Sequence, residues 1–109
     1  QENIEGYELA SEDVNVDFCF RVKGDSMVGA RILDGDLVYI RQQPEVENGE
    51  IAAVMVGDEE ATLKRFYKLD GTVLLRPENP DHQAQEYTKK NMKQIRVIGK
   101  AIFFRSEVR

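Results

Sequence analysis

The sequence predicts a mostly β domain, a rolled antiparallel sheet or partial barrel with little helix. Three observations support this fold class. The 109 residues are enough for one compact domain and leave little room for a second core. Short runs rich in β-branched and aromatic residues alternate with turn signals along most of the chain. No long stretch has the hydrophobic period of an amphipathic helix.

The first half of the chain contains three strand candidates. Apolar and polar side chains alternate over residues 18–22, which is typical of a half-buried strand, and Gly24–Asp25 ends this pattern. Residues 37–41 are a short β-rich run after the turn signal Asp34–Gly35–Asp36. Residues 51–56 are continuously apolar, which indicates a strand buried on both faces. The intervening segments are predicted as a short helical turn at 27–33 and a loop at 42–50.

The second half contains three more strand candidates. Residues 61–67 follow a hairpin turn at 57–60, and Asp70–Gly71 is a second hairpin signal before residues 73–76. A long polar segment with no clear period extends from Pro77 to Gln94. The last candidate covers residues 95–104 and is interrupted by Gly99.

The chain divides into a short arm and one domain. Residues 1–17 are acidic and only sparsely apolar, and we expect them to form a peripheral N-terminal arm. Residues 18–109 then make up the folded domain. The chain has no internal repeat and no low-complexity linker.

Composition and charge exclude several functional classes. A chain with 41% hydrophobic residues and a single cysteine is neither a disordered tail nor a disulfide scaffold. Twenty acidic against fifteen basic residues give a net charge of −5, which makes the domain a poor candidate for holding DNA by itself. The chain has no membrane-length apolar run and no signal peptide, so we expect a cytoplasmic protein without a membrane partner. One basic cluster is interpreted as a solvated face; it comprises Lys89, Lys90, Lys93 and Arg96.

Several common routes to catalysis find no support. His82 lies in a loop after two prolines and is interpreted as a solvated surface group. Cys19 is interpreted as a small core residue, because no histidine lies near it in the sequence. No pair of histidines or cysteines has the spacing of metal ligands, and no glycine-rich loop could hold a phosphate. We therefore expect no metal and no cofactor.

A serine and a lysine remain as candidates. Ser26 follows a strand at a tight Gly24–Asp25 break, where a sharp turn would expose its hydroxyl and leave backbone N–H groups for an oxyanion. Lys64 lies within a strand-like run, and burial there would lower its pKa from about 10.4 towards the ~7–8 of a general base. A neutral amine could then take the Ser26 proton. From these residues alone, the alternative is a turn serine and a lysine that extends to solvent.

Several ordered motifs together resemble the catalytic domain of LexA-type and lambdoid phage repressors, a self-cleaving serine peptidase family with a Ser-Lys dyad. The resemblance covers most of the chain, from Phe18 to Phe104. The motifs are the Gly-Asp-Ser-Met context in residues 20–27, the Asp-Gly-Asp-Leu turn in 32–37, the second block in 48–52 and 61–66, the Pro-Glu-Asn segment in 75–79 and the closing strand in 97–101.

This resemblance assigns roles to individual residues. It implies that Ser26 is the nucleophile and Lys64 the base, with the backbone amides of Asp25 and Ser26 as oxyanion donors. Met27 would pack beneath the nucleophile turn. The residues expected to support the local motif are Gly24, Met27, Asp34, Gly35 and Asp36.

The resemblance also implies partners. It predicts a homodimer paired through Ile102, Phe103 and Phe104 at a strand edge. The alternative is plain core packing, because two adjacent aromatics on a strand point to opposite faces and one of them must be buried anyway. The family's cleavage is often triggered by a RecA filament and separates a DNA-binding domain from this one. The chain has neither an Ala-Gly dipeptide nor a helix-turn-helix pattern, so we expect the C-terminal part of a repressor, with residues 1–17 as a remnant of the linker. The alternatives are a UmuD-like polymerase accessory subunit and a catalytically silent dimerisation module.

Overall fold

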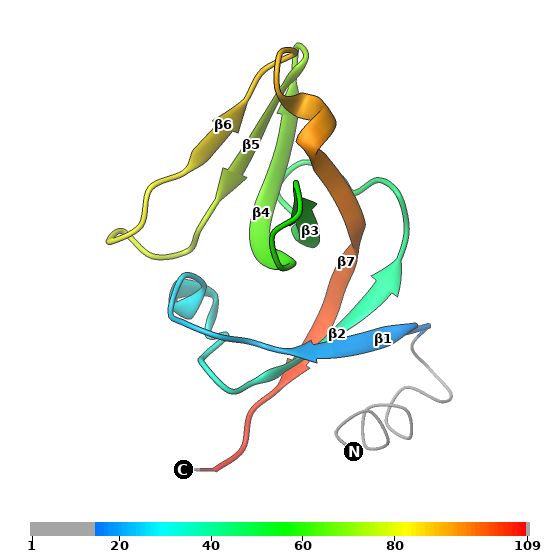
Figure 1. Cartoon of the computed structure of the whole chain (residues 1–109). Coiled ribbons are helices and arrows are strands. Elements are labelled where there is room, and N and C mark those ends of the chain that lie inside the picture. The colour runs from blue at the N-terminus through cyan, green and yellow to red at the C-terminus, as the bar shows by residue number, and fades with distance from the viewer. Residues whose placement is uncertain (1–14, 109) are drawn as a thin grey trace.

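The fold is a single seven-stranded antiparallel sheet. The computed structural model describes residues 15–108, so most of the predicted arm at residues 1–17 lies outside the described residues. The described part contains seven strands and two short 3-10 helices, drawn in Figure 1. The prediction of a mostly β domain is confirmed.

The strands largely follow the predicted ranges. They are β1 (Phe18–Arg21), β2 (Leu37–Gln42), β3 (Ile51–Val56), β4 (Thr62–Leu69), β5 (Thr72–Arg76), β6 (Gln85–Tyr87) and β7 (Ile95–Arg105). The predicted helical turn at 27–33 contains the short η1 (Val28–Ala30), and a second 3-10 turn, η2 (Met92–Gln94), precedes β7. The sequence did not predict β6, whose three residues are too few to show a period.

Strand β7 joins two sets of strands into one sheet. The order is β1-β2-β7-β3-β4-β5-β6, so the last strand of the chain lies between β2 and β3, as Figure 1 shows. The register of β7 shifts once against β2 and once against β3. Such bulges bend a strand, and β7 curves from one set of strands to the other. The outermost strands β1 and β6 do not pair with each other, so the sheet stays open.

Gly99 does not interrupt β7, which corrects the sequence prediction. The strand continues through it from Ile95 to Arg105. A Cβ at this position would collide with the backbone carbonyl oxygen of Arg41 in β2. Glycine is therefore needed here because the two backbones approach closely, and not because the strand ends.

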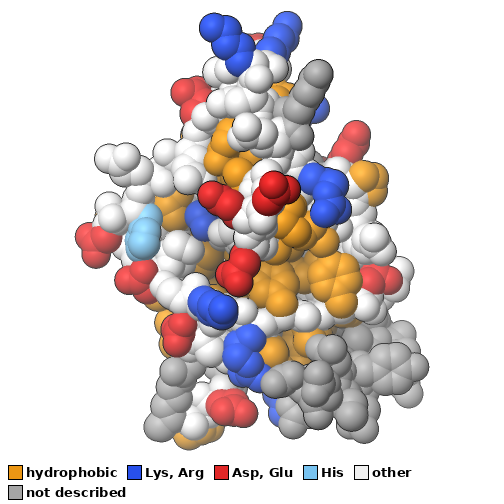
Figure 2. Space-filling model, viewed as in Figure 1, with side chains coloured by type: hydrophobic (Ala, Val, Ile, Leu, Met, Phe, Trp, Pro, Cys, Tyr) orange, Lys and Arg blue, Asp and Glu red, His pale blue; other side chains and the backbone are white. Residues whose placement is uncertain are grey.

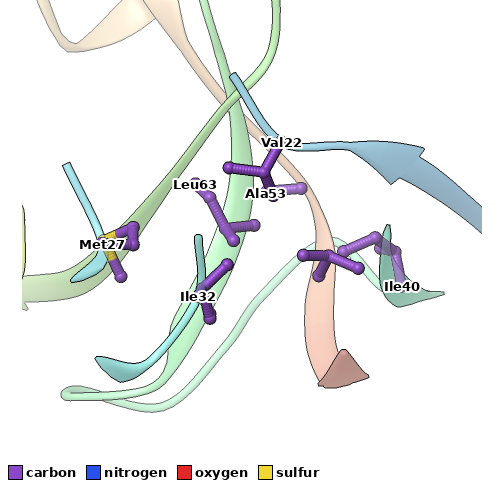
Figure 3. Close-up of a cluster of buried hydrophobic side chains, with 7 residues drawn as sticks. Val22, Met27, Ile32, Ile40, Ala53 and Leu63 are labelled. Atoms are coloured by element: carbon purple, nitrogen blue, oxygen red, sulfur yellow. The ribbon is translucent and has the colours of Figure 1, made fainter. Parts of the chain in front are cut away.

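The first core cluster lies beneath the segment that connects β1 and β2. Met27 and Ile32 come from this segment and pack with residues of β2, β3 and β4, as Figure 3 shows. Met27 is only 2% exposed. Burying a side chain of this size contributes about 1.5–3 kcal/mol, which stabilises a segment with little regular structure. The buried members of the cluster are Val22, Met27, Ile32, Val38, Ile40, Ala53 and Leu63.

The second core cluster lies on the opposite face of β3. Ala52 and Val54 belong to it, whereas Ala53 belongs to the first cluster, because successive side chains of a strand point to opposite faces. The prediction that residues 51–56 form a strand buried on both faces is thus confirmed for the central residues 52–54. The buried members of the second cluster are Ala52, Val54, Phe66, Val73 and Leu75.

Candidate active site

Ser26 lies in a turn, and residues nearby in the sequence hold one side of this turn. Gly24 has φ +88°, a conformation that favours glycine, and its N–H donates to Asp34 Oδ1 at 2.7 Å. Asp36 is almost fully buried, and its Oδ2 accepts the Leu33 N–H at 2.8 Å. The predicted turn residues Asp34 and Asp36 therefore bond to backbone groups, as short polar side chains do in turns.

The segment that follows β5 contacts the Ser26 turn from the other side. The Glu78 N–H donates to the Ser26 carbonyl at 2.8 Å, and the Gly29 N–H donates to the Glu78 carbonyl at 2.7 Å. A Cβ on Gly29 would lie 2.6 Å from that carbonyl oxygen, so the close contact requires glycine. Asn79 Nδ2 donates to the Asp25 carbonyl at 2.8 Å. The sequence did not predict these contacts.

Lys64 approaches the Ser26 hydroxyl from strand β4, in the middle of the sheet. It lies in β4, which pairs with β3 on one side and β5 on the other, opposite Ala52. Its Nζ lies 3.5 Å from Ser26 Oγ and 2.6 Å from Thr62 Oγ1. The structure thus brings together two residues that are 38 positions apart in the sequence. Thr62 was not predicted as a site residue, although alternation places it on the same face of the strand as Lys64.

Burial shifts the pKa of Lys64. Desolvation disfavours the charged ammonium, and it lowers the pKa of Lys64 below its ordinary value. The Nζ is partly buried, and the two hydroxyls of Ser26 and Thr62 are its hydrogen-bonding neighbours. A lysine with a lowered pKa beside a hydroxyl can accept a proton from it, which is the property of a general base.

An open groove runs past Ser26. Its volume is about 730 Å³, and its walls are apolar and charged residues of β1 and the turn that follows it, of the β3–β4 hairpin and of β7. Figure 2 shows hydrophobic side chains reaching the surface between acidic and basic ones on this face of the molecule. The groove is lined by Phe18, Phe20, Arg21, Val22, Lys23, Ser26, Met27, Glu59, Glu60, Ala61, Thr62, Leu63 and Ile98.

The Peptidase S24-like family matches residues 1–102 of the chain. The chain belongs to this peptidase family. A LexA repressor of Desulfitobacterium hafniense (strain DSM 10664 / DCB-2) is 54% identical over 83 residues, which are 73% of this chain and 40% of that protein. A LexA repressor of Geobacter metallireducens is 45% identical over 104 residues, which are 93% of this chain and 50% of that protein. The resemblance to LexA-type peptidase domains is confirmed, and the chain spans about half or less of the length of these relatives.

The family's predicted dimer residues lie at the end of β7. Inside the sheet β7 pairs on both sides, but after Lys100 it pairs only with β2. Phe103 stacks on Tyr39 of β2 with ring centroids 4.5 Å apart, whereas Phe104 is 37% exposed. The two aromatic side chains point to opposite faces of the sheet, as alternation along a strand requires, and Phe104 lies opposite the buried Val38.

Other predicted features lie elsewhere or differ from expectation. His82 is exposed, but its Nε2 lies 2.7 Å from Asp25 Oδ1, next to Ser26, so it is not merely solvated. Cys19 is half-buried in β1 and not part of either core cluster. In the basic cluster the described side chains are exposed; they are Lys89, Lys90 and Arg96, while the side chain of Lys93 lies outside the description.

Residues 15–108 contain neither a cluster of metal ligands nor a membrane-length helix. No three His, Cys, Asp or Glu side chains in this range are arranged to hold a metal ion. No helix in the same range is long and apolar enough to cross a membrane.

Proposed function

We propose that this chain is the peptidase and dimerisation domain of a LexA-type repressor, in which Ser26 attacks a peptide bond after Lys64 removes its proton. The observation that carries this proposal is the 3.5 Å separation of Lys64 Nζ and Ser26 Oγ at a partly buried position. Membership of a peptidase family supports it.

The first step forms an ester. Neutral Lys64 takes the proton of the Ser26 hydroxyl, and Oγ attacks the carbonyl carbon of the peptide bond. The negative charge that develops on the carbonyl oxygen is stabilised by the backbone N–H groups of Asp25 and Ser26. The Lys64 ammonium then donates its proton to the leaving amine, the C–N bond breaks, and the acyl group remains on Ser26.

The second step releases the product. Lys64, neutral again, removes a proton from a water molecule, and the hydroxide attacks the ester carbonyl. The ester bond breaks, and Ser26 Oγ recovers its proton from the lysine. Thr62 Oγ1, 2.6 Å from Nζ, holds the amine in place during both steps. The bond that is cleaved lies in a segment that enters the groove beside Ser26.

The resemblance to LexA-type repressors supports the proposed biological role. The substrate would be the linker between this domain and a DNA-binding domain of the same polypeptide, so cleavage would remove the avidity of a dimeric repressor. Two copies would pair through Ile102, Phe103 and Phe104. A RecA filament is proposed as the trigger, DNA as a ligand of the other domain only, and the cytoplasm as the location.

The dyad can be tested on this chain with a fluorophosphonate probe and mass spectrometry. Ser26 Oγ forms a bond to phosphorus, fluoride leaves, and the proton passes to Lys64. We expect the wild-type chain to gain the probe mass on Ser26 and the Ser26→Ala variant to gain none. Lys64→Ala should slow the reaction by about 10²–10⁴-fold, the usual contribution of a general base.

Matched controls come from exposed residues of the same kinds. Ser106→Ala and Lys68→Ala should react like the wild type, because both side chains are exposed, and Lys68 lies on the same strand as Lys64. Labelling that is equal in wild-type and Lys64→Ala chains would indicate a catalytically silent dimerisation module. In the polypeptide that joins this domain to a DNA-binding domain, Ser26→Ala should abolish cleavage into two fragments.

A further inference from the structure

We propose that Asn79 is a positioning residue that orients the Asp25–Ser26 peptide, so that the Ser26 N–H faces the reacting carbonyl oxygen. This inference rests on the proposed function of Ser26 as the nucleophile. It concerns a residue 53 positions further along the chain whose side-chain hydrogen bonds go to Asp25 and Asp81, and not to the Ser26 hydroxyl or the Lys64 amine.

The side chain of Asn79 is buried and uses both ends of its amide. It is 9% exposed, and it is one of two buried polar or charged side chains in residues 15–108. Its Nδ2 donates to the Asp25 carbonyl at 2.8 Å, and its Oδ1 accepts the Asp81 N–H at 2.9 Å. The second bond fixes which end of the amide faces Asp25, because only the NH₂ end can donate.

A bond to the Asp25 carbonyl determines the direction of the Ser26 N–H. The two groups belong to the same planar trans peptide, so they point in opposite directions. Asn79 holds the carbonyl at 2.8 Å and the Val28 N–H donates to it at 3.4 Å, so the Ser26 N–H is turned to the other side. Within residues 15–108 the Ser26 N–H donates no hydrogen bond, so it is available to an oxyanion.

A second contact from the same segment prevents the turn from rotating. The Glu78 N–H donates to the Ser26 carbonyl at 2.8 Å, which fixes the next peptide as well. The Glu78 carboxylate is held by Arg65, the residue after Lys64, at 3.2 Å, and by Arg76 at 2.9 Å. The segment that carries Asn79 is therefore attached to the strand of the lysine and to the turn of the serine.

The test compares Asn79 variants in the fluorophosphonate reaction, where the phosphoryl oxygen takes the place of the carbonyl oxygen. Asn79→Asp keeps the size of the side chain and the acceptor for the Asp81 N–H but has no N–H for the Asp25 carbonyl. We expect its plateau rate at high pH to fall about 10–100-fold, since loss of a whole oxyanion donor costs about 10²–10³-fold. The pH midpoint reports Lys64, and in the uncharged Asn79→Ala variant it should stay at the wild-type value because the proton transfer is untouched.

A matched variant separates positioning from stability. Val73→Ala creates a cavity in the second core cluster, away from Ser26, and should keep the wild-type plateau rate despite its lower melting temperature. Asn79→Ala should resemble Asn79→Asp in rate; if it does not fold, Asn79→Asp decides. An unchanged plateau rate in Asn79→Asp, or an equal loss in Val73→Ala, would overturn the positioning role alone. No reaction of the wild-type chain would overturn the proposed function and this inference with it.

Discussion

The serine and the lysine are held in place by different kinds of structure. Lys64 lies on β4, which has paired strands on both sides, and its position follows from the register of the sheet. Ser26 lies in the connection between β1 and β2, where only η1 is regular, and its position depends on contacts with residues 77–82. A strand position tolerates local change, whereas a turn position depends on a few specific bonds and on buried side chains such as Met27.

This difference has a physical reason. A general base needs a desolvated amine, and the interior of a sheet supplies that environment directly. A nucleophile must present both its hydroxyl and its backbone N–H groups to the substrate, and strand pairing would occupy those N–H groups. The nucleophile must therefore leave the sheet, and other parts of the chain must then hold it.

The largest expected effect comes from removing the amine and keeping the strand. Lys64→Met should slow the modification of Ser26 by about 10²–10⁴-fold. It should also raise the free energy of unfolding at pH 7, because the buried ammonium is costly in the folded state. Urea unfolding of both chains at several pH values measures the second effect.

The pH dependence of that gain has a definite sign. Burial lowers the pKa of Lys64 in the folded chain below its value of about 10.4 in the unfolded chain. Between these two pKa values the unfolded wild type binds more protons, so its stability rises with pH. The advantage of Lys64→Met should therefore be constant below the folded pKa and shrink as pH rises towards ~10.4. An advantage that grows with pH would contradict the burial of a charged amine.

Substitutions that create a cavity in each core cluster should distinguish the turn of Ser26 from the rest of the sheet. Met27→Ala and Leu75→Ala should each lower the free energy of unfolding by about 2–5 kcal/mol, because both side chains are almost fully buried. Only Met27→Ala should also slow the modification of Ser26, by about tenfold, since a shift of ~1 Å in a reacting group can cost roughly 10²-fold. Equal rates in the two folded variants would show that the turn does not depend on Met27.

The smallest expected effect concerns the partner of the lysine within its own strand. Thr62→Val removes the hydroxyl 2.6 Å from Nζ and should slow the reaction about two- to tenfold, the value of one hydrogen bond. It should also move the pH midpoint downwards, because the ammonium loses an acceptor. Thr62→Ser keeps the hydroxyl and should behave like the wild type; a loss of the same size in Thr62→Ser would point to packing.

The sequence predicted the strands well and the site in part. Alternation and apolar runs identified six of the strand regions, because each is long enough to show a period. Ser26 and Lys64 stood out as residues in unusual settings, and the motifs shared with LexA-type repressors linked them. The contacts of Asn79 and His82 could not be predicted, because they join residues 54 and 57 positions apart through a segment without periodicity.

The position of β7 within the sheet could not be predicted from the sequence either. Nothing in residues 95–104 indicates that this strand lies between β2 and β3, since pairing partners depend on the whole sheet. Gly99 shows that a glycine within a strand has two possible structural meanings. In the sequence a glycine within a strand suggests a break, whereas in the sheet it permits the close approach of Arg41.

The rate of Ser26 modification as a function of pH tests the central claim most directly. If a buried Lys64 is the base, the rate should rise with pH and then level off, with a midpoint below the ~10.4 of an ordinary lysine. The rise should be absent in Lys64→Met. A wild-type rate that does not change between about pH 6 and about pH 10 would contradict the account.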